Sequence, residues 1–133
     1  MQRPFTLGKD ERLKSRKQIE RLFSKGKSFV VNPYKIYYLI QMEKPGLQFG
    51  IGVSGKNFKT AVDRNRIRRL TREAYRLQKL PLQEKIKQLN KAVAVFFVYT
   101  GKELPDFILA KEKVAVVLKK IELIIDENVS SNS

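Results

Sequence analysis

The first apolar pattern along the chain predicts a short amphipathic helix near its N-terminus. Three apolar residues recur at the i, i+3 and i+4 spacing of one helix face, namely Ile19, Leu22 and Phe23. Just before them, Ser15 and Gln18 have the spacing of a capping box, in which the serine accepts a hydrogen bond from the backbone N–H three residues later. Gly26 is typical of a helix end, so we expect a helix of about three turns between Ser15 and Gly26.

Aromatic and β-branched residues that follow this helix predict the first strands of a sheet. The runs 29–31 and 34–40 are rich in such residues, and Asn32-Pro33 marks a break between two strands. Residues 43–46 then carry a turn signal, Glu-Lys-Pro-Gly.

Two further apolar segments predict one strand buried on a single face and one strand buried on both. From Leu47 to Val53, apolar residues alternate with polar residues or glycine, which is the pattern of a half-buried strand. Its second face carries Gly50 and Gly52, which either leave room for a backbone, a helix or a ligand, or reflect a bulge or tight packing. The continuous apolar run 92–99 suggests a central strand covered on both faces, and we interpret it as core rather than as a site.

The segment from Ala61 to Lys79 predicts an amphipathic helix. Thr60 and Asp63 have the spacing of an N-terminal cap, and Pro81 is expected to end the helix and begin a polar connection. Four apolar residues fall on the side that we expect to lie against the sheet: Ile67, Leu70, Ala74 and Leu77. The opposite side carries Arg64, Asn65, Arg68, Arg69, Arg72 and Arg76.

The basic side of this helix favours phosphate binding over a merely solvated surface. Its arginines recur at i and i+4, and each such like-charge pair costs roughly 0.2–0.5 kcal/mol in an isolated helix. A solvated helix usually interleaves Glu with Lys, whereas only Glu73 offsets the charge here. Guanidinium groups, by contrast, suit bidentate contacts to phosphate.

The remaining segments complete a single domain. Apolar residues from Val114 to Ile125 predict a final amphipathic helix, after a loop at 100–105. Residues 1–14 lack apolar periodicity and are expected to form a basic flexible arm, and residues 127–133 a disordered tail. Because no repeat or linker divides the rest, residues 15–126 are expected to form one α+β domain.

The charge balance points to a nucleic-acid partner. The chain has 28 Lys and Arg against 13 Asp and Glu, a formal net charge of +15 over 133 residues, and a polyanion relieves such self-repulsion. No apolar run approaches the ~20 residues that span a bilayer, and the N-terminus has no signal-peptide stretch. We therefore expect a cytoplasmic protein with no membrane partner.

The available residue types argue against chemistry by the protein itself. The chain has no Cys and no His, which removes the thiolate and imidazole ligands of most zinc and redox sites. Asp63 and Glu73 are interpreted as helix-cap and ion-pair residues, whereas a two-metal nuclease usually has several convergent carboxylates. We expect no catalytic residue and no metal site on the protein.

Two neighbouring segments carry a family resemblance. The strand end 49–54, Phe-Gly-Ile-Gly-Val-Ser, is followed by Ala-Val-Asp-Arg-Asn-Arg at 61–66, then by a basic pair and a further Arg. This combination resembles the protein component of bacterial ribonuclease P over roughly residues 10 to 125. It implies an α-β-β-β-α-β-α sandwich with a mixed four-stranded sheet, in which the basic helix makes a left-handed crossover between parallel strands, against the general right-handed rule.

The resemblance also implies a function and two RNA-binding surfaces. Such proteins bind ribonuclease P RNA and the 5′ leader of precursor tRNA, and assist leader removal in a holoenzyme whose RNA carries the catalytic magnesium ions. No DNA partner and no cofactor on the protein alone is implied. The contacts implied with the catalytic RNA are Lys56, Lys59, Arg64, Asn65, Arg66, Arg68, Arg69, Arg72 and Arg76. The leader cleft implied between the first helix and the sheet contains Ile19, Phe23, Lys35 and Tyr37.

Three positions depart from the family pattern. Ile19 stands where the family often has Phe, and Lys35 where an apolar residue is common, so we expect weaker stacking and stronger charge attraction in the cleft. Gly55 stands where Lys is common, which leaves the contacts of its loop open. The aromatic residues assigned to the cleft, Phe23 and Tyr37, are equally compatible with the core.

The alternative function is a structural RNA-binding protein of ribosomal or chaperone type. Such a protein would use the same basic helix without serving a processing enzyme, and charge alone does not separate the two. The Arg-Asn-Arg pattern at 64–66 favours ribonuclease P. An independent nuclease is the least favoured, because it would need metal-dependent chemistry from the protein alone.

Overall fold

The first two helices begin at the cap signals that predicted them. The computed structural model describes residues 11–13, 15–41 and 46–131, with side chains up to residue 127. Ser15 caps the first helix by accepting from the N–H of Gln18 at 3.5 Å, and Thr60 caps the second by accepting from the N–H of Asp63 at 3.4 Å. The elements are α1 (Arg16–Lys25), β1 (Lys27–Val31), β2 (Tyr34–Gln41), β3 (Gly46–Val53), α2 (Ala61–Gln78), α3 (Leu80–Gln88), β4 (Ala92–Tyr99) and α4 (Phe107–Ser131).

The four strands form one mixed sheet in the order β1-β2-β4-β3. β1 and β2 pair antiparallel around the break at Asn32-Pro33, β2 and β4 pair antiparallel, and β3 lies parallel to β4. The register places Tyr37 of β2, Phe96 of β4 and Gly50 of β3 side by side across the sheet. The predicted α+β class and mixed four-stranded sheet are confirmed.

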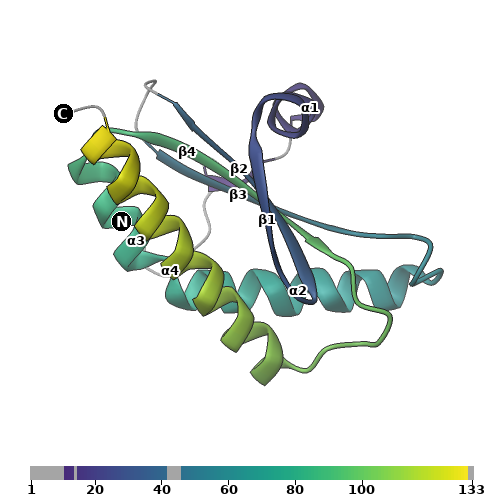
Figure 1. Ribbon diagram of the computed structural model, residues 1–133. Helices are drawn as coiled ribbons and strands as arrows, with labels where there is room; N and C mark the ends of the chain where they lie inside the picture. The colour runs from purple at the N-terminus through teal and green to yellow at the C-terminus, as the bar shows by residue number, and fades with distance from the viewer. Residues whose placement is uncertain (1–10, 14, 42–45, 132–133) are drawn as a thin grey trace, which may run out of the picture.

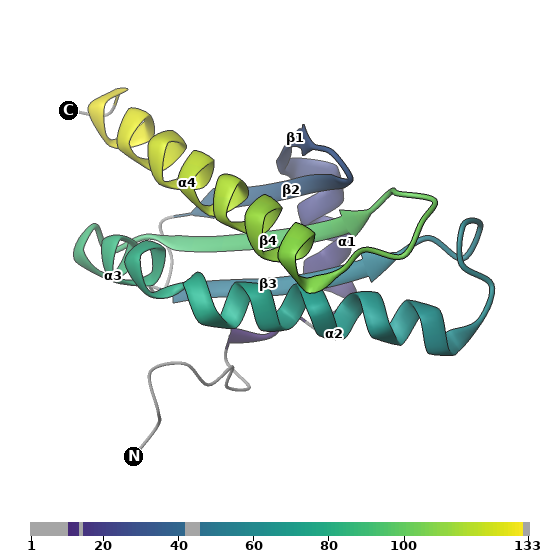
Figure 2. The same cartoon turned by 90° about the horizontal axis from the view of Figure 1, so that it is seen from below.

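The sheet has one fully covered face and one open face. Helices α2, α3 and α4 lie on one side of the sheet, and α1 lies alone on the other (Figure 1). Viewed from below, α2 runs alongside the edge strand β3 (Figure 2). The covered face buries alternate strand residues, among them Tyr34, Ile36, Phe49, Val95 and Phe97, against helix residues such as Ile67, Val117 and Ile121. The alternation leaves the other set of side chains half-exposed on the α1 side.

The segment after Pro81 forms a helix, α3, where the sequence pattern predicted only a polar connection. Pro81 lies in its first turn, where a missing N–H breaks no helical hydrogen bond, so the proline ends α2 and also starts α3. Leu82 and Ile86 bury the inner side of this helix. Its many Gln and Lys residues hid this single apolar pair.

The buried stripe of α2 is rotated from the predicted one. Ile67 and Ala74 are buried as expected, but Leu77 is 39% exposed. Thr71 and Tyr75 take its place, because the Thr71 hydroxyl lies 2.7 Å from the Tyr34 hydroxyl, and Tyr75 stacks on a strand phenylalanine with 4.0 Å between ring centroids. Aromatic stacking and a buried hydrogen bond thus outweigh simple apolar periodicity.

Some residues of the predicted arm and tail are part of the described fold. Helix α4 starts at Phe107 and continues through 127–131, because no Gly or Pro interrupts it and each added residue gains a hydrogen bond. Within the predicted arm, Leu13 is buried and its N–H donates to the Phe49 carbonyl at 2.8 Å. The rest of the arm, residues 1–10 and 14, most of the turn predicted at 43–46, and residues 132–133 lie outside the described residues.

Candidate nucleic-acid interface

The outward side of α2 presents most of the residues predicted to contact the catalytic RNA. Asn65, Arg66, Arg69 and Arg72 are exposed, and Arg68 is half-buried. One guanidinium nitrogen of Arg68 donates to the Asn65 side-chain oxygen at 3.0 Å. The helix therefore holds several like charges together at its surface, an arrangement that a polyanion stabilises.

Arg64 is placed differently, because it holds the loop before α2. Its Nη1 donates to the carbonyl oxygens of Phe58 and Lys59 at 2.8 and 2.9 Å. Asn57 ties the same loop to carbonyl groups after β4 at 3.3 and 3.4 Å. Lys56 and Lys59 are exposed on this loop, next to the start of α2. Arg64 thus positions two predicted cations in addition to supplying its own charge.

Arg76 is also engaged within the protein. Its Nε donates to Oε2 of Glu73 at 3.1 Å, and this hydrogen bond lowers the pKa of the Glu73 carboxyl. The same bond raises the pKa of Arg76. Because a carboxylate already partners this guanidinium, Arg76 offers less free charge than Arg66 or Arg69.

The four residues predicted for the leader cleft come together on the open face of the sheet. Ile19 and Phe23 project from α1, and Lys35 and Tyr37 come from β2. The Phe23 and Tyr37 rings meet edge to face, with centroids 4.6 Å apart, and Lys35 Nζ lies 5.1 Å from the Tyr37 ring centroid. Phe23 nevertheless keeps 45% of its surface exposed. It therefore offers an accessible aromatic surface rather than a core side chain.

Phe96 is a cleft residue that the sequence prediction missed. Its ring lies 5.4 Å from that of Phe23 and covers the two glycines of β3. A Cβ on Gly50 would lie 2.5 Å from the Phe96 ring, and one on Gly52 would lie 3.1 Å from it. Tight packing is thus the reason for these glycines. The interpretation of 92–99 as core alone is wrong for its outward-facing half, because an unbroken apolar run does not indicate which alternate residues face the open side.

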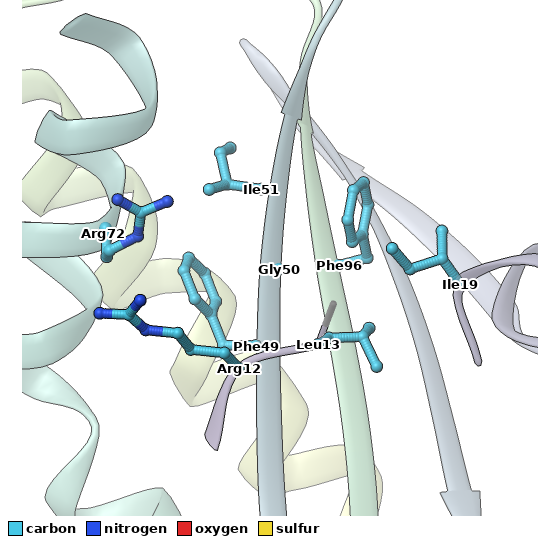
Figure 3. A pocket seen from close by; sticks show the side chains of 8 residues that line it. All are labelled: Arg12, Leu13, Ile19, Phe49, Gly50, Ile51, Arg72 and Phe96. Carbon is cyan, nitrogen blue, oxygen red and sulfur yellow. The ribbon is translucent and has the colours of Figure 1, made fainter. Parts of the chain in front are cut away.

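A pocket of about 290 Å³ joins the cleft to the basic helix around the edge of β3. Figure 3 shows Arg72 and Arg12 near Phe49, on the α2 side of β3, and Ile19 and Phe96 on the other side. Arg72 is exposed as a whole, but partial desolvation of its guanidinium lowers the pKa of Arg72, and the nearby charges of Arg12 and Arg68 lower it further. Arg12 was assigned to the flexible arm, and nothing in its local sequence indicated this position.

The described residues contain no grouping typical of a metal site or a membrane span. Within residues 11–13, 15–41 and 46–131, no three His, Cys, Asp or Glu side chains cluster so as to hold a metal ion. In the same part of the chain, no helix is both long and apolar enough to cross a bilayer.

Comparison with known proteins identifies the family. The family model described as Ribonuclease P matches residues 7–122. A relative from Porphyromonas gingivalis named ribonuclease P protein component is 39% identical over 105 residues, which is 77% of each chain. A relative of the same name from Chlorobium phaeobacteroides is 31% identical over 130 residues, or 89% of each chain.

Solved structures show the same fold. The RNase P protein of Staphylococcus aureus superposes with a TM-score of 0.69 at 23% identity, over 84% of this chain and 94% of that one. The RNase P protein of Thermotoga maritima gives a TM-score of 0.67 at 25% identity, over 83% and 96%. The match of the family model over most of the chain, together with the curated relatives, shows that this chain belongs to the ribonuclease P protein family.

Proposed function

We propose that this chain, as a subunit of ribonuclease P, binds the catalytic RNA through the outward side of α2 and the 5′ leader of precursor tRNA on the open face of the sheet. In this role it assists the endonucleolytic removal of the leader that gives the mature tRNA 5′ end. The observation that carries the proposal is the convergence of five side chains on that open face: Ile19, Phe23, Lys35, Tyr37 and Phe96.

The chemistry of the open face suits unpaired RNA. Exposed bases stack on aromatic rings for roughly 1–3 kcal/mol each, and this stacking tolerates different sequences. Phe23 is 45% exposed and stands beside Tyr37, so a base has an aromatic surface to cover. Lys35 lies next to the same ring and supplies a positive charge for the backbone. A leader of variable sequence is the kind of ligand that such a surface accepts.

The basic side of α2 suits a structured RNA. Arg66 and Arg69 point their charges to solvent, and the lysine-bearing loop 54–60 extends the same surface. Contacts of this kind go to phosphates and carry little sequence information, so they place the protein on a folded RNA. The two surfaces lie on different sides of β3, so both RNA segments can bind at once.

The proposal assigns the chemical step and its magnesium ions to the RNA subunit. The protein then contributes binding energy and positive charge, which lower the magnesium concentration that the holoenzyme needs. We place this activity in the cytoplasm, because a chain without cysteine agrees with a reducing compartment. The family match argues against the alternative of a ribosomal or chaperone-type RNA binder.

Reconstituted cleavage tests the proposal. A precursor tRNA is incubated at low magnesium with a bacterial ribonuclease P RNA, with and without this protein, beside a protein-only control. We expect correct 5′ cleavage only when both components are present. RNA binding without stimulation would support the structural RNA binder, and cleavage by the protein alone would support an independent nuclease.

A further inference from the structure

Two arginines from distant parts of the chain meet at the edge of β3. Arg12 forms an isolated parallel β-bridge with Phe49 of β3, and Arg72 comes from α2, the helix beside β3. Both line the pocket at this edge, and their side chains extend on the same side of the strand (Figure 3). Arg72 is near enough to Arg12 for the positive charge of Arg12 to lower its pKa. Like charges are thus held together without an evident structural need.

A buried ion pair fixes the segment that carries Arg12. Glu11 pairs with Lys79, whose side chain is only 1% exposed, and also accepts from Gln83 Nε2 at 2.8 Å. On the other side of Arg12, the Leu13 N–H donates to the Phe49 carbonyl. Residue 12 is therefore anchored on both sides, which holds its guanidinium near Arg72.

Among the residues that the structure describes, neither arginine has a partner that neutralises its charge. In the described ranges, no hydrogen bond or ion pair joins the guanidinium of Arg12 or Arg72 to another residue, in contrast to Arg64 and Arg76. Two guanidinium groups that line one pocket offer several N–H donors, which suit the oxygens of one phosphate. The apolar half of the pocket, with Ile19 and Phe96, continues directly into the aromatic cleft.

We propose that Arg12 and Arg72 form a clamp for a single phosphodiester group of an RNA strand at the edge of β3, an inference that rests on the proposed function. The clamp holds the backbone while the neighbouring base lies toward Phe96 and Ile19. Glu11 acts as a positioning residue, because it sets the place of Arg12 without touching the RNA. The phosphate belongs either to the 5′ leader or to the catalytic RNA, and the two are separable by experiment.

A double-mutant cycle tests the clamp in the holoenzyme. Arg12→Gln, Arg72→Gln and the double variant are each assembled with ribonuclease P RNA, and the affinities for precursor tRNA, for mature tRNA and for the RNA subunit are measured. Lys119→Gln, an exposed charge on α4, is the control for a general loss of charge. We expect each single change to weaken binding by about tenfold, as for one charge-assisted hydrogen bond. The double change should fall far short of a hundredfold, because both arginines share one ligand.

The salt dependence supplies a second readout. Each single variant and the double variant should flatten the slope of log affinity against log salt by about the same amount, roughly 0.7, since one phosphate contact is lost in every case. An effect on precursor but not on mature tRNA identifies the leader as the source, and an effect on binding of the RNA subunit identifies the catalytic RNA. Additive losses, or losses no larger than for Lys119→Gln, would overturn the clamp.

The stability of the variants separates binding from folding. Because the two arginines repel each other, the Gln variants should unfold in urea at the same or a higher concentration than the parent chain. Lower stability would show that the arginines hold the fold and would overturn the inference. If the parent chain failed to stimulate cleavage, the proposed function would fail. If the parent chain stimulated cleavage but the losses of the two single variants were additive, only the clamp would be contradicted and the proposed function would stand.

Discussion

Glu11→Gln probes whether the segment before α1 is an integral part of the fold. In the structure, Glu11 is the ion-pair partner of Lys79, whose side chain is 1% exposed, while Glu11 itself is 17% exposed. The substitution removes the negative charge of Glu11 from the buried ammonium group of Lys79. It also weakens the hydrogen bond that Gln83 donates to Glu11. The N-terminal segment should then detach from the junction of α2 and α3.

The expected cost follows from the burial of the pair. Removal of one partner of a buried ion pair costs about 3–5 kcal/mol, because the remaining charge has lost its compensation. Glu11 keeps partial contact with water, so we take the lower end, about 3 kcal/mol. That value lowers the ratio of folded to unfolded protein by a factor of about 150.

Urea unfolding followed by far-UV circular dichroism measures this change. Glu20→Gln is the matched control, since it removes the same charge from an exposed pair with Arg16, with the two side chains 67% and 93% exposed. That pair should contribute less than about 1 kcal/mol. A second variant, Glu11→Gln with Lys79→Met, should recover much of the loss because no charge remains buried. If Glu11→Gln and Glu20→Gln had equal effects, the buried-pair argument would be refuted.

Three further substitutions test other parts of the account. Phe23→Ala should weaken holoenzyme binding of precursor tRNA by about tenfold through lost stacking and leave mature tRNA unaffected, whereas Val30→Ala, an exposed control on β1, should change neither; equal losses on both tRNAs would contradict the leader assignment. Arg69→Gln should flatten the slope of log affinity against log salt for catalytic-RNA binding by about 0.7–0.9. An unchanged slope would show that the outward side of α2 does not bind the catalytic RNA. Burial raises the pKa of Tyr34 from 10.0 to about 12, so its stabilising contribution is full below pH 10 and is lost as the pH rises toward 12. Urea unfolding at several pH values should therefore show a smaller loss across that range in Tyr34→Phe, and an identical loss would contradict the assigned pKa.

Local signals predicted most of the elements. Ser15 and Thr60 mark the starts of α1 and α2 because a cap acts within one turn of the helix. The alternation from Leu47 to Val53 predicted β3 because it depends only on which face the sheet buries. Such signals operate over a few residues, so they are visible in a single sequence.

Features that depend on distant partners were not visible. Phe96 lies in an apolar run, and only its register opposite Tyr37 and Gly50 places it in the cleft. Arg12 was assigned to an arm because its anchor, the pair between Glu11 and Lys79, joins residues far apart in the sequence. Both errors concern the edge of β3, where segments from three parts of the chain meet.

The position of the leader on the protein is the most direct test of the whole account. A precursor tRNA with a photoreactive uridine in its leader is bound to the reconstituted holoenzyme, irradiated, and the modified protein residues are identified by mass spectrometry, with mature tRNA as the control. We predict that crosslinks will map to the open face of the sheet, at Phe23, Tyr37 or Phe96. Crosslinks confined to α4, or equal labelling with mature tRNA, would contradict leader binding in this cleft.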